Sequence, residues 1–428
     1  MADAATPWPD PFPVEPRPGL DIRVRPPGSR SLTNRALVAA ALAPGRSVVE
    51  GVTASDDALA MRRGLAALGV RIEGPGETWT VSGRGGRFAA PQQTIDVGAS
   101  GTTARFLTAA AALAAGPATI DGTRRMRERP IDDLVDAMAA LGAPGRILGH
   151  GGCPPVEIRG GGLPGGTAIV DASRSSQFVS GLLLAAPCAA SEVALELKEG
   201  ALVSRPFVEM TLDVMRAFGA RPEWTGPATL RVPATGYRET HYVVEPDAQA
   251  AVYAFAAAAV TRGRVVVEDL GAASSQGDLG ILDALERMGC TVERASRAIE
   301  VRGPARLRGV TVDGNAWPDA VLALAVVAAF AHGPTRISGL AHLRIKETDR
   351  LAALETELRR IGAGATADAD GLRIEPGPVR PATIETYDDH RMAMSFAIAG
   401  LAADGIAIRD PGCVSKTWPD FFDVLRTW

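Results

Sequence analysis

The chain has 428 residues, a length that favours two or more hydrophobic cores over a single one. Its composition is that of a globular protein, 46% hydrophobic and 22% charged, with few aromatic residues. The formal net charge of −4 argues against a broadly basic surface for nucleic acid or anionic membranes. Four scattered cysteines form no CxxC pair, which argues against a zinc site or a disulfide framework and favours a reducing cytoplasm.

The first 19 residues are rich in proline and lean acidic. They lack the basic start and apolar run of a signal peptide, so we expect a loose extended arm. The longest apolar runs, such as residues 321–331, are too short to cross a bilayer, and we expect a soluble protein.

Five predicted helices end at a glycine, a residue suited to a left-handed C-terminal cap. The glycines fall 70 to 77 residues apart, at Gly69, Gly142, Gly219, Gly289 and Gly362, which indicates repeated supersecondary units. A β-rich segment precedes each helix, as in SVVEGV, ATIDG and VVVEDL, and the final FFDVLRTW looks like a shortened sixth unit.

A second set of predicted helices is apolar on every side, which is the pattern of a buried helix. These helices start near Ser31, Thr102, Ser175, Ala248, Pro318 and His390. Helix capping explains serine, threonine and aspartate at such starts. It does not explain Arg35, Arg105 and Arg391, because cations oppose the helix dipole at this end. We therefore expect these helix starts to converge on a polyanionic ligand.

Six units suggest two domains of three units each. The predicted first domain is 28–243, and the second combines 1–27 with 244–428, so the chain crosses near residues 26–28 and again near 242–245. We expect the active site in the cleft between the domains, where such ligands usually bind.

The stretch 343–363 carries leucines at helical spacing and ends at Gly362. A helical start here would place Lys346, Glu347 and Arg350 on one face. A carboxylate between cations at a helix start suits an anion site with a proton donor nearby. The alternative is an ordinary solvated run of charges, and the motifs of the remaining chain decide between the two.

The segments PGSRSLTNRA, RPID, SSQF, PDA, KETDRL, DHRMAM and SKTWPDF, in this order, resemble the 5-enolpyruvylshikimate-3-phosphate synthase family from about Pro27 onward. The resemblance implies an α/β fold: a two-domain inside-out α/β barrel of six βαβαββ-type repeats, three per domain, around buried parallel helices. It implies a transferase, 3-phosphoshikimate 1-carboxyvinyltransferase, in aromatic amino-acid (chorismate) biosynthesis. This enzyme moves the enolpyruvyl group of phosphoenolpyruvate to the 5-hydroxyl of shikimate 3-phosphate and releases phosphate. The implied protein is a cytoplasmic monomer with these two small-molecule substrates, no cofactor, no metal, and no nucleic-acid or membrane partner.

The same resemblance implies the roles of individual residues. Asp319 would take the hydroxyl proton, and Glu347 would protonate the methylene carbon of the enol. Shikimate 3-phosphate would be bound by Arg30, Ser31, Arg35, Ser175, Ser176, Gln177, Ser204, Asp319, His342 and Lys346. Phosphoenolpyruvate would be bound by Arg30, Gly101, Arg125, Gln177, Arg350, Arg391 and Lys416. Both substrates are multiply charged anions, so a net acidic chain must gather its cations locally.

Read without the resemblance, several of these residues have plainer roles. Asp319 would cap the apolar helix that follows it, and His390 would be a structural hydrogen-bonding residue. Arg124, Arg127 and Arg129 are given a surface or structural reading in either case.

The chain departs from the family pattern at a few positions. Arg30 replaces the usual lysine, and arginine keeps the charge but not the compact shape. Phe207, His342 and Gln249 stand where tyrosine, asparagine and serine are common. Two alternatives follow: a paralogous enolpyruvyl transferase acting on another phosphorylated cyclic alcohol, or a non-catalytic anion-binding homologue. The sister transferase acting on UDP-N-acetylglucosamine is disfavoured because residues 123–130 contain no cysteine, and retention of both carboxylates favours catalysis.

Overall fold

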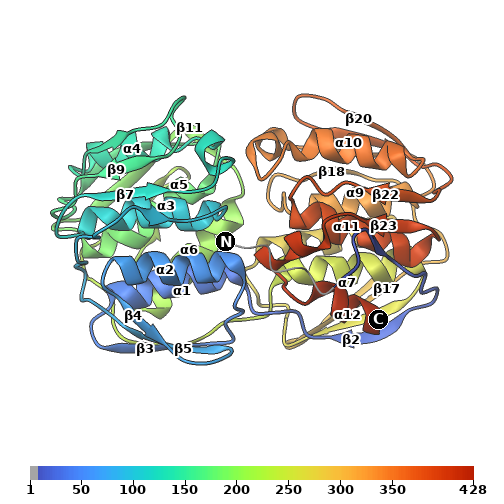
Figure 1. Ribbon diagram of the computed structural model, residues 1–428, viewed down its shortest axis with the longest axis horizontal. Helices are drawn as coiled ribbons and strands as arrows, with labels where there is room; N and C mark the ends of the chain where they lie inside the picture. The colour runs from blue at the N-terminus through green and yellow to red at the C-terminus, as the bar shows by residue number, and fades with distance from the viewer. Residues whose placement is uncertain (1–7) are drawn as a thin grey trace. The chain divides into compact units, whose positions relative to one another are not determined.

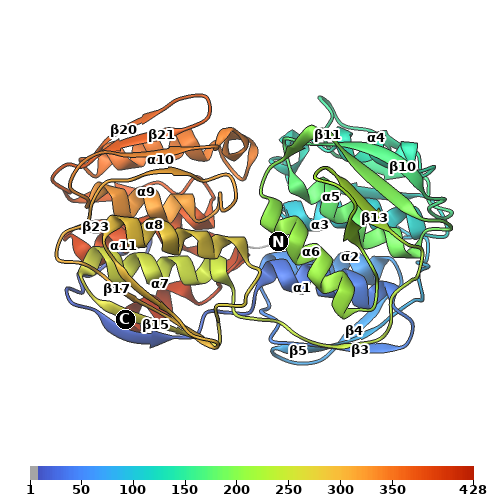
Figure 2. The same cartoon turned by 180° about the vertical axis from the view of Figure 1, so that it is seen from behind.

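The computed structural model describes residues 8–428, which fold into two compact units (Figures 1 and 2). The N-unit is Gly28–Glu245, and the C-unit combines the segment up to Pro27 with Pro246–Trp428. The chain therefore leaves the C-unit after Pro27 and returns to it after Glu245. One backbone hydrogen bond closes each unit at this point: Ser29 donates to Glu245 and Asp247 donates to Pro27, each at 2.8 Å.

Three apolar helices form the interior of the N-unit, as predicted from their apolar surfaces. They are α1 (Arg30–Leu42), α3 (Gly101–Ala110) and α5 (Ser176–Ala185), and every residue of α1 is buried. Three further helices have one buried and one exposed face: α2 (Asp56–Ala67), α4 (Asp132–Ala140) and α6 (Arg205–Ala217). The 3₁₀ segments of this unit are η1 (Ala111–Leu113), η2 (Met126–Glu128) and η3 (Ala186–Cys188).

The C-unit repeats this arrangement. Its interior helices are α7 (Ala248–Thr261), α9 (Val321–Ala329) and α11 (His390–Ala402), which lie side by side in Figure 1. Its outer helices are α8 (Ile281–Met288), α10 (Arg350–Arg360) and α12 (Phe421–Thr427). Short 3₁₀ segments η4 (Gly277–Gly280), η5 (Ala341–Ile345) and η6 (Pro411–Lys416) come before α8, before α10 and after β23. No helix within residues 8–428 is long and apolar enough to cross a membrane.

The sheets of the described chain are mixed, and five of them share one strand pattern: one parallel pair followed by two antiparallel pairings. In the N-unit the orders are β14-β3-β5-β4, β6-β7-β9-β8 and β10-β11-β13-β12. The bounds are β3 (Arg46–Glu50), β4 (Arg71–Glu73), β5 (Thr78–Ser82), β6 (Ile95–Asp96), β7 (Ala118–Asp121), β8 (Gly145–Ile147), β9 (Val156–Ile158), β10 (Gly166–Ala172), β11 (Val193–Leu202), β12 (Glu223–Trp224), β13 (Thr229–Val232) and β14 (His241–Val243).

In the C-unit the orders are β2-β15-β17-β16, β18-β19-β21-β20 and the three-stranded β1-β23-β22. The bounds are β1 (Phe12–Pro13), β2 (Asp21–Val24), β15 (Arg264–Glu268), β16 (Thr291–Arg294), β17 (Ala298–Arg302), β18 (Thr311–Asp313), β19 (Thr335–Ser338), β20 (Gly364–Ala367), β21 (Leu372–Glu375), β22 (Ala382–Ile384) and β23 (Ile406–Ile408). The shorter third sheet belongs to the segment that ends in α12.

The five predicted helix-ending glycines are confirmed by their backbone angles. Each follows an outer helix with φ between 83° and 108°. A side chain in this left-handed region is strained, so glycine ends the helix at little cost and lets the chain turn into the next strand.

The prediction of a loose N-terminal arm is wrong for residues 8–19, and residues 1–7 lie outside the described part. Trp8 and Phe12 are buried, and β1 pairs antiparallel with β23. The Phe12 ring lies 4.5 Å from that of Phe422, and the Trp8 indole donates to Asp423 at 2.8 Å. The high proline content suggested an extended arm, but apolar side chains of this segment, including Trp8 and Phe12, pack within the C-unit.

We predict that Phe12→Ala lowers the free energy of unfolding by about 3 kcal/mol, because a buried aromatic ring leaves a cavity. The exposed fraction of Phe12 is 2%. Urea unfolding followed by tryptophan fluorescence measures the change, with the exposed Glu15→Ala as the control on the same segment. An unfolding midpoint for Phe12→Ala equal to that of the control would contradict the docked arrangement.

Candidate active site

A buried arginine in the C-unit binds three carboxylates. Arg350, the first residue of α10, is 1% exposed. Its Nη1 lies 2.7 Å from Asp319 Oδ1, and its Nε lies 2.7 Å from Asp389 Oδ2. Its Nη2 lies 2.9 Å from Glu347 Oε2. Burial acts to lower the pKa of Arg350, but the three carboxylates outweigh it and raise that pKa well above its ordinary value.

Asp319 lies just before α9, yet it does not cap that helix. The cap position is Ala320, without a side-chain hydrogen bond, so the capping interpretation of Asp319 is wrong. Its Oδ2 accepts a hydrogen bond from Gln249 at 2.9 Å and lies 3.1 Å from Arg391 Nη2. Burial acts to raise the pKa of Asp319, but Arg391 and Arg350 outweigh it and hold the pKa below its ordinary value. Asp319 is therefore ionised at neutral pH and able to accept a proton, although a low pKa makes it a weak base.

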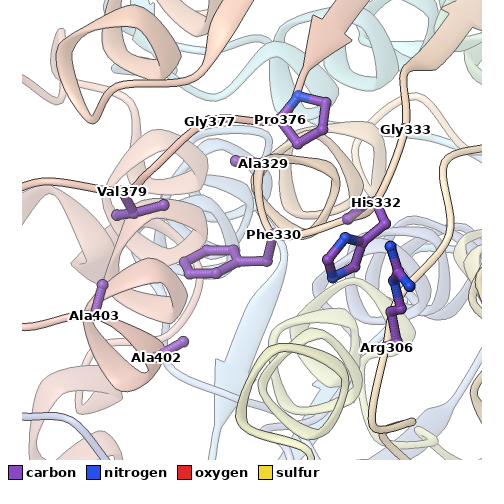
Figure 3. Close-up of a pocket in the computed structure, with 11 residues that line it drawn as sticks. Arg306, Ala329, Phe330, His332, Gly333, Pro376, Gly377, Val379, Ala402 and Ala403 are labelled. Carbon is purple, nitrogen blue, oxygen red and sulfur yellow. The ribbon is translucent and has the colours of Figure 1, made fainter.

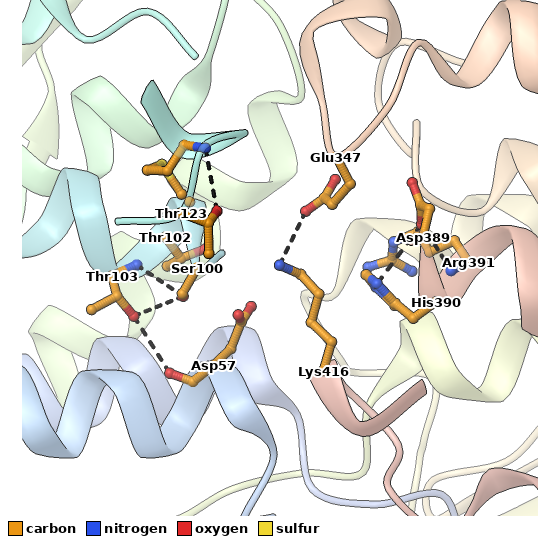
Figure 4. Close-up of polar contacts among 12 residues, drawn as sticks. Asp57, Ser100, Thr102, Thr103, Thr123, Glu347, Asp389, His390, Arg391 and Lys416 are labelled. Carbon is orange, nitrogen blue, oxygen red and sulfur yellow. Dashed lines mark hydrogen bonds and ion pairs between the residues drawn. The ribbon is translucent and has the colours of Figure 1, made fainter. Parts of the chain in front are cut away.

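Glu347 lies between two cations of the C-unit. Besides Arg350, its Oε1 lies 3.6 Å from Nζ of Lys416, the last residue of η6, and Figure 4 shows the two side chains pointing toward one another. The prediction that Lys346, Glu347 and Arg350 share one face of a helix is wrong. Asp349 caps α10 by accepting a hydrogen bond from the Ala352 backbone, so Lys346 and Glu347 precede the helix. The contact between Glu347 and Arg350 forms without it.

The start of α11 brings Asp389, His390 and Arg391 into the same cluster (Figure 4). Asp389 caps the helix by accepting from the Arg391 backbone at 2.9 Å, while its carboxylate also binds Arg350. The Arg391 side chain donates to Gln249 Oε1 at 2.6 Å. Asp389 thus caps the N-terminus of α11 and also binds the buried guanidinium of Arg350, the first residue of α10.

His342 lies in η5, four residues before Lys346, and is 5% exposed. Burial, followed by the charge of Lys346, lowers the pKa of His342 to about 4. Its Nε2 has no hydrogen-bond partner in the described chain. The side chain is therefore a neutral, buried donor or acceptor at neutral pH.

In the N-unit, predicted anion-binding residues lie at the starts of the interior helices. Arg30, the first residue of α1, is ion-paired with Asp57 of α2 at 2.6 Å, and both are buried. The Asp57 carbonyl accepts from Thr103, which ties the start of α3 to α2 (Figure 4). Gln177 of α5 donates to Thr102 of α3 at 3.2 Å.

The serines of this set occupy the same helix starts. Ser175 caps α5 by accepting from the Gln177 backbone, and Ser176 is the buried first residue of that helix. Ser31 is buried in the first turn of α1, and Ser204 precedes α6 with a left-handed φ of 54°. Their hydroxyls, with the free backbone N–H groups of helix starts, suit a phosphate.

Arg35 has a packing role that the dipole argument missed. Its guanidinium is 2% exposed and donates to the Ser31 carbonyl, the Phe207 carbonyl and the Thr211 hydroxyl at 2.8 to 2.9 Å. Burial lowers the pKa of Arg35 to about 9, so it stays cationic at neutral pH. Arg105 similarly donates to the Pro130 carbonyl at 2.8 Å. These interior hydrogen bonds fix the positions of both arginines near the starts of α1 and α3.

The last two predicted residues of the N-unit differ in burial. Gly101 begins α3, where an added Cβ would lie 2.6 Å from Arg129 Nη2, so a larger residue would require the Arg129 guanidinium to shift. The surface or structural role predicted for three neighbouring arginines agrees with their positions. Arg129 is buried, Arg124 is exposed, and Arg127 pairs with Asp121. Arg125 is half-buried and pairs with Glu128 at 2.9 Å.

The structure joins Asp319, Glu347, Arg350, Arg391 and Lys416 in one network of the C-unit. Sequence reasoning missed the contacts of Asp389 and the bridging role of Gln249 in this network, and it missed the pairing of Asp57 with Arg30 in the N-unit. The acidic first turn of α2 was a signal for Asp57, since helix starts favour carboxylates. Residues 8–428 contain no cluster of three or more His, Cys, Asp or Glu side chains that could hold a metal ion.

A surface hollow of about 810 Å³ lies elsewhere on the C-unit (Figure 3). It is lined by Phe330, His332, Ala402 and Arg306, at the C-terminal ends of α9 and α11. Asp319 and His390 are at the opposite ends of these helices, so the hollow is separate from the candidate site.

Buried cations around two carboxylates, Asp319 and Glu347, in mixed α/β units suit a site for small anionic ligands. The family model described as EPSP synthase (3-phosphoshikimate 1-carboxyvinyltransferase) matches residues 14–425, and the chain therefore belongs to this family.

Relatives from distant organisms agree with this assignment. The chain is 45% identical to the 3-phosphoshikimate 1-carboxyvinyltransferase of Nostoc punctiforme over 94% of this chain and 95% of that protein. It is 46% identical to that of Methanoculleus marisnigri, over 95% and 96%. The EPSP synthase structure from Acinetobacter baumannii superposes with a TM-score of 0.82 at 29% identity, covering 97% of both chains.

We predict that His342→Asn removes a pH-dependent loss of stability. Below about pH 6.5 the unfolded chain binds a proton at His342 that the folded chain refuses until about pH 4, so stability falls as the pH falls. From pH 7 to about pH 5, the wild type should lose about 2 kcal/mol more than the variant. Urea titrations at both pH values measure this. The exposed His150→Asn is the control, and equal pH dependence of the two variants would contradict the assignment.

Proposed function

We propose that this protein transfers the enolpyruvyl group of phosphoenolpyruvate to the 5-hydroxyl of shikimate 3-phosphate and releases phosphate. The observation that carries the proposal is the attachment of both candidate reactive carboxylates, Asp319 and Glu347, to the single buried guanidinium of Arg350. The 3-phosphoshikimate 1-carboxyvinyltransferase activity of the relatives from Nostoc punctiforme and Methanoculleus marisnigri supports the choice of substrates.

The substrate-binding residues expected from the family resemblance are part of the proposal. Phosphoenolpyruvate is bound by Arg350, Arg391 and Lys416, with further contacts from Arg30, Gly101, Arg125 and Gln177. Shikimate 3-phosphate is bound by Arg30, Ser31, Arg35, Ser175, Ser176, Gln177, Ser204, Asp319, His342 and Lys346. Fixed cations offset the repulsion between two anions that must meet.

Binding of phosphoenolpyruvate would change the charge state of Glu347. In the described structure Arg350 and Lys416 are paired with Glu347, which favours its ionised form. When the substrate anion takes over donors of these cations, Glu347 loses stabilisation and gains proton affinity. The substrate thus prepares the acid that protonates its own methylene carbon.

The proposed chemistry is addition followed by elimination. The 5-hydroxyl loses its proton to Asp319 and its oxygen bonds to the central carbon of phosphoenolpyruvate, while Glu347 gives a proton to the methylene carbon. In the tetrahedral intermediate this carbon is a methyl group. One methyl proton then returns to Glu347 as the C–O bond to phosphate breaks, which restores the double bond, and the proton held by Asp319 leaves with the phosphate.

The proposal extends to the architecture. Each unit is a three-repeat inside-out α/β barrel of βαβαββ-type units, with domains of 28–243 and of 1–27 plus 244–428. The strand pattern shared by five sheets and the buried interior helices support it. The proposed protein is a monomer in a reducing compartment, the cytoplasm, and the four cysteines, which form no disulfide, are compatible with that.

A second candidate, a transferase for another phosphorylated cyclic alcohol, is favoured by one observation. Arg30 replaces the family lysine and is held by Asp57 at 2.6 Å. A bulkier, fixed cation at this position changes the room left for the acceptor substrate.

We predict that the purified protein releases inorganic phosphate from shikimate 3-phosphate and phosphoenolpyruvate, and that Glu347→Gln lowers kcat at least about 100-fold by removing the acid. A phosphate assay measures both, and the exposed Glu375→Gln on β21 is the matched control. Folded wild-type protein without release would reject the proposal. Wild-type kcat in Glu347→Gln would reject the role of Glu347 alone.

We also predict that Arg30→Lys keeps kcat/KM within about tenfold of the wild type, because the charge is retained. Arg30→Met should lower kcat/KM about 100-fold or more, since it removes a charged donor to the anions. Steady-state kinetics with both substrates measure the pair, and equal kcat/KM values for Met and Lys variants would contradict a binding role for Arg30.

A further inference from the structure

Glu357 is a buried carboxylate of α10 that the proposed chemistry does not use. It lies seven residues after Arg350, so the two side chains point from the same face of the helix, two turns apart. The exposed fraction of Glu357 is 0%, and a charged group is tolerated in such a place only when hydrogen bonds or ion pairs compensate its lost hydration. The partners of Glu357 therefore show which segment of the chain it holds.

These partners join α10 to the segment that precedes α11. Glu357 Oε1 accepts a hydrogen bond from the Tyr387 hydroxyl at 2.8 Å, and Oε2 accepts one from the Glu385 backbone at 3.3 Å. Arg360, three residues further along α10, donates to Oε2 at 2.8 Å. Both carboxylate oxygens are thus used, and two of the three donors belong to residues 385–387.

The segment that Glu357 holds has a strained backbone. Tyr387 and Asp388 have φ of 57° and 54°, in the left-handed region that residues with a bulky side chain rarely adopt. Such a conformation persists only where the surrounding contacts favour it over relaxed alternatives. The Asp389 backbone donates to the Thr386 carbonyl at 2.9 Å and closes the turn, while Glu357 attaches the turn to α10.

The turn ends at Asp389, which contacts α10 a second time. The Asp389 carboxylate accepts from Arg350 Nε at 2.7 Å and from Arg350 Nη2 at 3.2 Å. It also accepts from the Arg391 backbone at 2.9 Å, at the start of α11 (Figure 4). Helix α10 therefore holds this segment at two places, through Arg350 and through Glu357, with the strained turn between them.

We propose that Glu357 and Tyr387 are positioning residues: the hydrogen bond between them holds the strained turn that places Asp389 and Arg391 in the candidate active site. The inference rests on the proposed function, and it adds two residues that are assigned to neither substrate. Their effect passes through Arg350 and Arg391, which are proposed to bind phosphoenolpyruvate. Most residues proposed for shikimate 3-phosphate belong to the N-unit, so loosening the turn should weaken the binding of phosphoenolpyruvate selectively.

The test measures kcat and both KM values in the wild type, Tyr387→Phe, Glu357→Gln and the double variant. Tyr387→Phe removes one hydroxyl from a residue that is 40% exposed, so this variant should fold. KM for phosphoenolpyruvate should rise about fivefold in Tyr387→Phe and about tenfold in Glu357→Gln, while KM for shikimate 3-phosphate stays within about twofold. The double variant should match Glu357→Gln, because the two side chains act as one unit.

Glu355→Gln is the matched control, since Glu355 lies on the same helix and pairs with Arg359 at 2.6 Å. It should keep both KM values of the wild type. A role of Tyr387 in stability alone would lower the urea midpoint and kcat through a smaller folded fraction, and would leave both KM values unchanged. That result, or an equal rise in KM for the two substrates, would overturn the inference.

A second readout does not depend on turnover. Because the backbone amides of Asp389 and Arg391 donate hydrogen bonds within the turn and the helix cap, their hydrogen exchange reports whether this segment is held. Exchange in residues 384–391 should be about tenfold faster in Tyr387→Phe than in the wild type or Glu355→Gln. Equal exchange in the three proteins would overturn the inference. Faster exchange in Tyr387→Phe, with no phosphate release by the wild type, would reject the proposed function and keep the structural link between Tyr387 and the turn.

Discussion

The structure depends on one buried guanidinium. Arg350 is almost fully enclosed and satisfies carboxylates from three segments: the residue before α9, the connection before α10 and the cap of α11. Removing one partner of such a buried network typically costs about 3 to 5 kcal/mol, because the remaining charges lose their compensation. The segments that carry the candidate acid and base are therefore joined by buried ion pairs as well as by the apolar core of the C-unit.

The repeated fold makes that concentration of charge possible. The interior helices of the C-unit are mostly apolar, and two residues that bind Asp319, Gln249 and Arg391, lie in the first turns of α7 and α11. Asp389 has two roles at such a helix start, because it caps α11 and also accepts a hydrogen bond from Arg350. The N-unit uses the same device at α1, α3 and α5, where serines and Arg30 gather.

The sequence predicted the α/β fold and the burial of the interior helices well, because apolar periodicity and helix-ending glycines are local signals. Motif order indicated Asp319 and Glu347. It could not indicate that Gln249 contacts this cluster, because its partners Asp319 and Arg391 lie 70 and 142 residues away in the chain. The hydrogen bonds of Arg35 could not be predicted for the same reason, since its partners Phe207 and Thr211 belong to a distant helix. The burial of Trp8 and Phe12 was not predicted, because the prolines around them indicated a loose arm.

The most direct measurement is a crystal structure of Glu347→Gln with shikimate 3-phosphate and phosphoenolpyruvate bound. The account predicts phosphoenolpyruvate against Arg350, Arg391 and Lys416, and the acceptor hydroxyl within hydrogen-bond distance of Asp319. Both anions bound away from these side chains, with the Arg350 network unchanged, would contradict the account.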